Sequence, residues 1–323
     1  MRALVVSEHG GPEVLAVREL PEPTPDAGQV SVRVTVSGVN FIDVYHRTGL
    51  YPMPLPFVLG LEGVGTVASL GAAVTGLAVG DRVGWSGTPG SHADVVVVPA
   101  DRLVRIPDGI DDESATSVLL QGMTAHYLAS STYPVQPGDW VLVHAAAGGV
   151  GVLLTQIIRS RGGHVIGTVS TAAKETLARQ FGAEHVIRYA DADDVAGTVR
   201  ALTGGRGVAA VYDGVGASTF ESSLASLRPR GMLVLFGQSS GPVPPFDLAR
   251  LNTAGSLYVT RPTLGHYLAD RAELTWRAGE VLGWVADGSL SVHIGRSYPL
   301  ADARAAYGDL EARRSTGKLL LTR

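Results

Sequence analysis

Cysteine is absent from this sequence. Its absence excludes disulfides, zinc sites built from thiolates and a cysteine nucleophile. A chain without disulfides fits a reducing compartment, so we expect the protein in the cytoplasm. The sequence also lacks the N-terminal pattern of a signal peptide and any apolar run of about 18 residues, which a membrane helix needs.

Charged residues are few. They make up 17% of the chain, the formal net charge is -4, and no long basic run occurs. Proteins that bind nucleic acid or anionic membranes usually carry a basic patch. We therefore expect neither partner and predict a small-molecule ligand instead.

Glycine, in contrast, is abundant, with 41 residues among 323, and hydrophobic residues reach 45%. This composition predicts a packed core with many tight turns and close backbone approaches.

The first hundred residues are rich in short predicted strands. Four valines at every second position, Val30, Val32, Val34 and Val36, alternate with polar residues, as in a half-buried strand. The irregular spacing of the strands predicts a small barrel or folded sheet rather than alternating strands and helices. Further strands are predicted at Gly63–Leu70, Arg82–Trp85 and Ala93–Pro99, and a helix at Asp112–Ser130.

The pattern changes after residue 138, where short apolar strands alternate with helices of about ten residues. Such alternation is typical of a parallel, doubly wound α/β sheet. The tail from about Arg261 does not continue this repeat, and we expect it to return to the first domain. The predicted strands of the repeat are Trp140–Ala145, His164–Ser170, Val186–Tyr189, Val208–Tyr212, Gly231–Phe236 and Ser256–Thr260.

The segment His144–Gly151 lies between an apolar strand and an amphipathic helix, where a dinucleotide-binding turn belongs. Gly148 would let the backbone approach a pyrophosphate, and Gly151 would let the helix pack closely on the strand. The helix N-terminus would present N–H groups to the anion. Ala146 replaces the first glycine of the usual pattern, and a plain turn without ligand is the alternative interpretation.

The end of the second strand of the repeat indicates which dinucleotide binds. NAD sites carry Asp or Glu there, whereas this sequence has no acid before Glu175. A carboxylate would repel a 2′-phosphate, so its absence, with Ser170, Lys174 and Tyr189 nearby, favours NADPH. An ordinary solvated lysine is the alternative interpretation of Lys174.

Several segments together resemble the bacterial NADPH:quinone oxidoreductases and zeta-crystallin, over essentially the whole chain. The resemblance implies a medium-chain dehydrogenase/reductase with a β-rich GroES-like catalytic domain (1–123 and 262–323) and a Rossmann NADPH-binding domain (124–261). It also implies a homodimer formed through the edge of the Rossmann sheet, with residues 255–259 as the candidate edge. The segments are Gly38–Tyr45, Gly49–Pro52, Ala145–Gly151, Tyr212–Gly216, Phe236–Gly241 and Ser256–Pro262.

The resemblance implies a set of cofactor contacts as well. Asn40 and Tyr45 would face the nicotinamide half, and Thr124 would touch the cofactor from the helix that joins the domains. The other implied contacts are Gly148, Gly149 and Val150 for the pyrophosphate, Ser170, Lys174, Tyr189 and Arg313 for the 2′-phosphate, Phe236, Gly237, Gln238 and Ser239 on the ribose–nicotinamide side, and Thr260 and Arg261, which close the pocket.

No metal site is expected. Zinc-dependent relatives have Gly-His-Glu where this sequence has Gly60-Leu61-Glu62, and no cysteine can supply the other ligands. Without zinc, hydrogen-bond donors must stabilise the charge that develops on the acceptor.

Asn40, Tyr45 and Tyr51 are the candidate catalytic donors. The alternative is that both tyrosines only wall the pocket. Asp43, three residues after Asn40, either orients it or caps a helical turn.

These features predict zinc-independent, NADPH-dependent reduction of quinones. An NADPH-dependent enoyl or alkene reductase acting on α,β-unsaturated carbonyl compounds would share every cofactor residue and is the main alternative. A third is an NADPH-binding structural or RNA-binding protein with little turnover, which the acidic balance disfavours.

Overall fold

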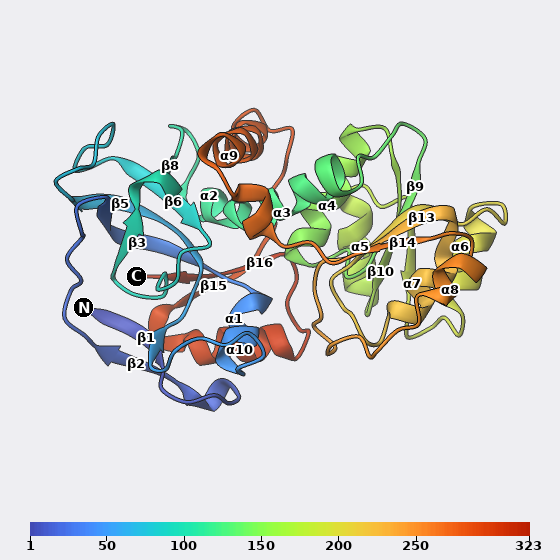
Figure 1. Ribbon diagram of the computed structural model, residues 1–323, viewed down its shortest axis with the longest axis horizontal. Coiled ribbons are helices and arrows are strands. Elements are labelled where there is room, and N and C mark those ends of the chain that lie inside the picture. The colour runs from blue at the N-terminus through green and yellow to red at the C-terminus, as the bar shows by residue number, and fades with distance from the viewer. The chain divides into compact units, whose positions relative to one another are not determined.

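The computed structural model describes residues 1–323 and divides into two compact units. The first comprises Met1–Met123 and Leu268–Arg323, and the second Thr124–Tyr267 (Figure 1). The sequence-based boundary at residue 262 falls between strand β14 (Tyr258–Thr260) and helix α9 (Arg271–Ala286).

The first unit is built on a seven-stranded sheet with the order β15-β16-β3-β5-β6-β8, in which β7 also pairs with β3. A second, three-stranded sheet has the order β2-β1-β4. This arrangement confirms the predicted β-rich fold. The strands are β1 (Arg2–Val6), β2 (Leu15–Glu19), β3 (Gln29–Val39), β4 (Phe57–Val58), β5 (Glu62–Leu70), β6 (Arg82–Ser86), β7 (Val95–Pro99), β8 (Val104–Arg105), β15 (Ile294–Pro299) and β16 (Lys318–Thr322).

Strand β3 is the centre of this sheet, and its valines follow the predicted alternation. The four valines at positions 30, 32, 34 and 36 are at most 4% exposed, whereas Arg33 and Thr35 between them are exposed. The first three pack with Trp85 and the valines of β5, β6 and β7 in one apolar cluster. Burial of one face of β3 fixes its register against its neighbours, because a slip of one residue would expose the valines.

The last strand of the chain lies in the same sheet as the first strands. Strand β16 pairs antiparallel with β3, where Leu320 lies opposite Gly38, and parallel with β15. Residue Lys318 at the start of β16 is thereby placed near the end of β3.

Five α-helices accompany the sheets of the first unit. They are α1 (Phe41–Arg47), α2 (Asp112–Leu119), α3 (Gln121–Tyr127), α9 (Arg271–Ala286) and α10 (Ala303–Glu311); α3 begins in the first unit and ends in the second.

The predicted helical segment Asp112–Ser130 is helical, but it is not one continuous helix. The helix is interrupted at Leu120, whose backbone N–H donates to Glu62 Oε2 at 2.7 Å instead of to a helical carbonyl. A wider π-helical turn follows at Leu128–Thr132. The interruption has a tertiary cause, since the acceptor lies 58 residues away in the sequence.

The second unit is a six-stranded parallel sheet with the order β11-β10-β9-β12-β13-β14. Helices α4 and α5 lie on one side of its strands, and α6 and α7 on the other (Figure 1). The predicted doubly wound sheet is confirmed, and the strand order is that of dinucleotide-binding folds. The elements are β9 (Trp140–Val143), α4 (Gly149–Ser160), β10 (His164–Val169), α5 (Ala172–Gln180), β11 (His185–Arg188), α6 (Val195–Leu202), β12 (Val208–Asp213), α7 (Phe220–Ser226), β13 (Leu227–Leu235), α8 (Ala249–Thr253) and β14.

The order reverses direction between β9 and β12, which pair side by side although three helices and two strands separate them in the sequence. In open α/β sheets, ligands bind outside the carboxyl ends of the strands at such a switch point. The segment after β9 is therefore the first place to seek a site in this unit.

None of the helices combines the length and the apolar composition that crossing a bilayer demands.

Candidate functional site

The turn after β9 connects the strand to helix α4 through residues 144–148. Ala145 adopts a left-handed conformation, with φ of 52°, and the N–H of Gly148 donates to Ala145 O at 2.8 Å. A non-glycine residue in this conformation is uncommon and costs conformational energy. The turn brings the backbone sharply round into α4.

Helix α4 begins without a side-chain cap. Gly148 is its N-cap residue and has no side chain to accept from the first-turn N–H groups. Helices α2, α5, α6 and α9, by comparison, each have an Asp or Thr N-cap whose side chain accepts such a bond. No side chain therefore accepts from the first N–H groups of α4, and together with the partial positive charge of the helix N-terminus they can bind an anion.

Glycines make the close packing around this turn possible. A Cβ on Gly151 would overlap the backbone of Ala145 and Ala146, so the helix can approach the turn only with glycine there. The methyl group of Ala146 in turn lies against Gly167 of β10, where a Cβ would come within 2.7 Å of it. The sheet accommodates alanine in place of the first glycine because the neighbouring strand carries the glycine instead.

The carboxyl end of β10 presents the residues predicted for the 2′-phosphate. Ser170 follows the strand, Thr171 caps α5 by accepting from the N–H of Lys174 at 3.3 Å, and Tyr189 N–H donates to Val169 O at 3.1 Å. Ser170, Lys174 and Tyr189 are thus gathered at the ends of the adjacent strands β10 and β11.

The first acidic residue after β10, Glu175, does not make this strand end unfavourable for a phosphate. The carboxylate of Glu175 pairs with Arg179 at 2.9 Å and with Arg188 at 3.4 Å. Its negative charge is balanced by these two guanidinium groups, and no carboxylate belongs to residues 167–171.

The loops after β12 and β13 are held together by one buried carboxylate. Asp213 is 0% exposed; its Oδ1 accepts from the N–H groups of Val215 at 2.8 Å and Gly216 at 3.0 Å. Its Oδ2 accepts from Thr219 at 2.7 Å and Ser223 at 2.8 Å. The backbone oxygen of Asp213 also accepts from the N–H of Phe236 at 2.8 Å, so Phe236–Ser239 is packed on this loop.

His144 connects the same hydrogen-bond network to β9 and β10, the first two strands of the second unit. Its Nε2 lies 3.0 Å from Ser223 Oγ, and its Nδ1 lies 2.9 Å from Thr168 Oγ1. Burial lowers the pKa of His144, although Asp213 opposes this shift. Neutral His144 therefore donates from Nε2 to Ser223, which itself donates to Asp213, and accepts from Thr168.

In the first unit, Asn40 ends β3 and begins α1. Its backbone N–H donates to Asp43 Oδ2 at 2.8 Å, which is one half of a capping box. Of the two roles predicted for Asp43, the structure shows the capping of helix α1. Asn40 is only 3% exposed, and its side-chain amide makes four hydrogen bonds. Its Nδ2 donates to Glu62 Oε1 at 2.8 Å and to Gly38 O at 3.2 Å, and its Oδ1 accepts from Lys318 Nζ at 2.9 Å and Gln121 Nε2 at 3.1 Å.

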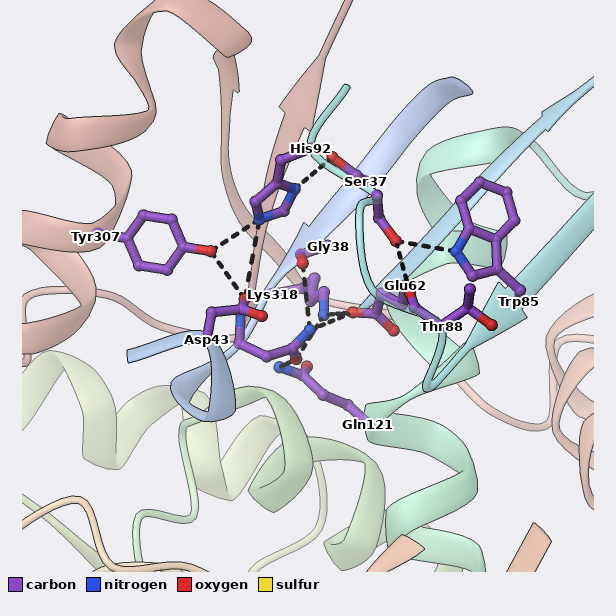
Figure 2. Close-up of polar contacts among 12 residues, drawn as sticks. Ser37, Gly38, Asp43, Glu62, Trp85, Thr88, His92, Gln121, Tyr307 and Lys318 are labelled. Carbon is purple, nitrogen blue, oxygen red and sulfur yellow. Dashed lines mark hydrogen bonds and ion pairs between the residues drawn. The ribbon is translucent and has the colours of Figure 1, made fainter. Parts of the chain in front are cut away.

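A chain of buried polar groups continues from Asp43 away from Asn40 (Figure 2). Tyr307 donates to Asp43 Oδ2 at 2.8 Å, His92 Nε2 lies 2.8 Å from the Tyr307 hydroxyl, and Ser37 Oγ lies 2.9 Å from His92 Nδ1. Burial holds the pKa of His92 well below its ordinary value, so its 3.9 Å approach to Asp43 is not an ion pair.

Burial raises the pKa of Asp43 to about 7, although bonds from Asn40 and Tyr307 favour the ionised form. Its Oδ1 is buried and has no hydrogen-bond partner. An unpartnered carboxylate oxygen in the interior is unfavourable when charged, which explains the direction of the shift.

Of the two candidate tyrosines, Tyr45 belongs to α1 and Tyr51 to the loop after it, and their rings are in contact. The rings of Tyr45 and Tyr51 are 5.1 Å apart with an edge-to-face geometry, and the N–H of Tyr51 donates to Tyr45 O at 3.0 Å. Tyr45 is 7% exposed, whereas Tyr51 is half-buried. The aromatic contact fixes Tyr51 in the loop after α1.

The predicted site residues are therefore distributed over both units. Asn40, Tyr45, Tyr51 and Arg313 belong to the first unit, where Arg313 follows α10 with φ of 56°. The second unit contains the others, which follow the carboxyl ends of β9, β10, β11, β13 and β14: Gly148, Gly149, Val150, Ser170, Lys174, Tyr189, Phe236, Gly237, Gln238, Ser239, Thr260 and Arg261, with Thr124 on α3.

Comparison with known proteins places the chain in a family. The GroES-like domain of alcohol dehydrogenases matches residues 26–108, and the zinc-binding dehydrogenase domain matches residues 149–276. A quinone oxidoreductase of Pseudomonas aeruginosa is 45% identical, with 97% of each chain covered, and a 2-haloacrylate reductase of Burkholderia is 40% identical, covering 99% of this chain and 98% of that protein. The structure of the Escherichia coli quinone oxidoreductase complexed with NADPH has a TM-score of 0.98 at 40% identity, with full coverage of both chains.

The chain belongs to the quinone oxidoreductase family of medium-chain dehydrogenases/reductases. This membership confirms the resemblance stated from the sequence.

One matching domain is called zinc-binding, but the residues of this chain do not fit a zinc site. The position of the expected histidine ligand is Leu61, cysteine is absent, and no three His, Asp or Glu side chains gather as a metal-binding group. The carboxylate of the neighbouring Glu62 is already bound to Lys318, Asn40 and the N–H of Leu120, so it is not free to coordinate a metal. We derive no catalytic step through zinc.

Sequence reasoning missed several residues that surround the predicted site residues of each unit. Glu62, Lys318 and Gln121 surround Asn40, and His144 and Asp213 anchor the loops of the second unit. The role of Asp213 was predictable, because an Asp at the start of a loop commonly accepts from the backbone N–H groups two and three residues later, here those of Val215 and Gly216. Lys318 gave no such signal.

The raised pKa of Asp43 predicts a pH-dependent stability that Asp43→Asn removes. Its folded pKa of about 7 lies above the ordinary 3.8, so its contribution is fully present below about pH 4 and is lost as the pH rises through about 7. We expect the free energy of unfolding of the unmodified protein, relative to Asp43→Asn, to fall by on the order of a few kcal/mol over this range. Urea denaturation at a series of pH values measures it; parallel curves for the two proteins would contradict the shift.

Proposed function

We propose that this protein catalyses zinc-independent, NADPH-dependent reduction of quinones. The observation that carries the proposal is the uncapped N-terminus of α4 behind a glycine turn, next to a strand end that has serine and lysine but no acid. Similarity over the full chain to quinone oxidoreductases, one of them solved with NADPH, supports it.

The second unit would bind most of the dinucleotide. Gly148, Gly149 and Val150 would hold the pyrophosphate through the free N–H groups of α4. The 2′-phosphate would be bound by Ser170 and Lys174, with Tyr189 and Arg313. Bound NADPH supplies the hydride, and the remaining proposed contacts are Thr124, Phe236, Gly237, Gln238, Ser239, Thr260 and Arg261.

The first unit would supply the polar groups that face the reacting end. Asn40 and Tyr45 are proposed to contact the nicotinamide half, and Tyr51 to donate a hydrogen bond to the acceptor oxygen. Without a metal, the negative charge on the acceptor must be stabilised by such donors. Quinones suit this arrangement because their charge delocalises onto an oxygen.

The main alternative is reduction of an activated alkene. The 40% identity to a 2-haloacrylate reductase favours this second candidate. Both reactions use the same cofactor contacts, so the acceptor alone distinguishes them. A low-turnover NADPH-binding structural or RNA-binding protein is a third candidate, which the net charge of -4 disfavours.

We also propose a homodimer formed through β14. This strand is the last in the parallel sheet, and Tyr258 and Val259 on it are 57% and 38% exposed. An unpaired edge with apolar side chains favours association with another strand. A cytoplasmic location, without nucleic-acid partners, remains a proposal that the absence of cysteine and the net charge support.

A panel of acceptors tests the proposed function. We expect NADPH oxidation with 1,4-benzoquinone to exceed that with a crotonyl thioester by about tenfold or more in kcat/KM, and a chelator to leave the rate unchanged. Absorbance of NADPH measures both. A faster reaction with the crotonyl compound would favour the alkene reductase, and no oxidation with either acceptor would leave the third candidate.

Ser170→Asp tests the placement of the 2′-phosphate. The new carboxylate would repel the phosphate and accept from a ribose 2′-hydroxyl, so we expect NADPH affinity to fall by about tenfold or more and NADH affinity to rise. Titration of the bound dinucleotides by calorimetry measures both constants. Ser170→Asn is the matched control, because it has nearly the same shape without the charge; undiminished NADPH affinity in Ser170→Asp would refute the placement.

Tyr51→Phe tests hydrogen-bond donation to the acceptor. Loss of a donor that acts in the transition state lowers turnover by roughly 10²-fold, whereas loss of a wall residue's hydroxyl does not. We expect a large fall in kcat with an unchanged Kd for NADPH. Tyr258→Phe at the exposed edge serves as control, and a normal kcat in Tyr51→Phe would remove Tyr51 from the mechanism.

A further inference from the structure

A buried ion pair lies directly against Asn40 in the first unit. Lys318 and Glu62 are 1% and 0% exposed as side chains, and they form a charge-assisted hydrogen bond (Figure 2). Lys318 Nζ also donates to Asn40 Oδ1, and Glu62 Oε1 accepts from Asn40 Nδ2. The ammonium, the carboxylate and the amide thus form a closed triangle of hydrogen bonds.

This triangle permits only one orientation of the Asn40 amide. In the observed orientation, its NH2 group faces two acceptors, Glu62 and Gly38 O, and its oxygen faces two donors, Lys318 and Gln121. Rotation by 180° would set the NH2 group against the ammonium and the oxygen against the carboxylate. Both contacts would be repulsive in a buried environment.

The ion pair is poorly explained by stability alone. Removal of two charges from water costs several kcal/mol per ion, and a packed apolar pair in the same place is often equally stable or more so. The fold also reserves room for the carboxylate, because a Cβ on Gly38 would overlap it. Three positions, Gly38 in β3, Glu62 in β5 and Lys318 in β16, therefore maintain this ion pair. Its structural effect is that the Asn40 amide is held in one orientation.

We propose that Lys318 and Glu62 are positioning residues for the reduction: they fix the Asn40 amide in the orientation in which it meets the nicotinamide half of the cofactor. This inference rests on the proposed function. Neither residue touches the cofactor in this proposal; both act through Asn40, and Gln121 completes the set of bonds. The N–H that faces Gly38 has the longer bond, 3.2 Å. In this proposal it is the N–H that Asn40 would share with the cofactor.

The test is a double-mutant cycle between the ion pair and Asn40. Glu62→Gln with Lys318→Met removes both charges together, so that no single charge stays buried without a partner. We expect this double variant to lower kcat with quinone by about tenfold or more, and to cost nothing further when Asn40 is already alanine. Equal losses in both backgrounds, or a normal kcat in the folded double variant, would overturn the proposal.

The matched control removes another ion pair of the first unit that also has a buried cation. Arg47 at the end of α1 is 1% exposed and binds Glu311 through two bonds of 2.8 Å. Arg47→Met with Glu311→Gln should leave kcat within about threefold, since neither residue contacts Asn40. A loss as large as in the first pair would indicate general loosening of the unit and contradict a positioning role.

A second readout does not depend on turnover. The side-chain NH2 resonances of Asn40, assigned by their loss in Asn40→Ala, should be sharp and protected from solvent exchange in the unmodified protein with and without NADPH. They should exchange at least about tenfold faster in the Glu62→Gln, Lys318→Met variant. If that variant does not fold, Gly38→Ala displaces the Glu62 carboxylate with both charges retained, and the same loss of kcat and of protection is expected.

The outcomes separate the two proposals. Quinone turnover by the unmodified protein together with independent effects in the cycle retains the proposed function and overturns the positioning role. Absence of NADPH-dependent turnover by the unmodified protein overturns the proposed function, and with it the role of the ion pair in catalysis.

Discussion

A carboxylate buried away from water must receive hydrogen bonds from the surrounding protein, and in the first unit this requirement arranges the elements around Glu62. Its two oxygens accept from the Lys318 ammonium on β16, the Asn40 amide at the end of β3 and the backbone N–H of Leu120 between α2 and α3. One acidic residue on β5 thereby joins four segments of the chain. Displacement of any of them would leave a buried charge short of donors, which is more costly than a small gap between apolar side chains.

The second unit follows the same principle with Asp213. This buried carboxylate accepts from two backbone N–H groups of its own loop and from two hydroxyl groups near α7. His144 extends the connection to the ends of β9 and β10 through Ser223 and Thr168. Hydrogen bonds are directional, so they hold loops at the strand ends in defined positions where apolar packing would permit sliding.

Much of the fold was predictable because its signals are local. The alternating valines of β3 and the alternation of strands and helices after residue 138 depend only on neighbours in the sequence, and both predictions were confirmed. The glycine turn after β9 was predicted for the same reason, since Gly151 is needed wherever a helix packs so closely on a turn.

The features that sequence reasoning missed have partners far away in the sequence. Lys318 is 256 residues from Glu62, and no spacing or pattern at either position indicates the other. The interruption of the helix at Leu120 has the same origin, because the acceptor of its N–H belongs to β5. Helix propensity describes a chain in isolation, whereas a buried carboxylate 58 residues away competes for the same N–H group.

The ion pair also bears on which acceptors the protein can reduce. Lys318 places a fixed positive charge at Glu62, next to the position that a histidine ligand occupies in zinc-dependent relatives and that Leu61 occupies here. A divalent metal in this place would have no imidazole or thiolate to bind it, and the Glu62 carboxylate is already bound to Lys318, so no metal is held there to stabilise an alkoxide. The negative charge that develops on the acceptor must then be stabilised by neutral hydrogen-bond donors. Such donors stabilise a localised oxyanion less than a metal ion does. Acceptors that spread the incoming charge over a conjugated system need less stabilisation at any one oxygen. A site without metal ligands therefore favours quinones and activated alkenes over simple ketones; two similar proteins are a quinone oxidoreductase and a 2-haloacrylate reductase.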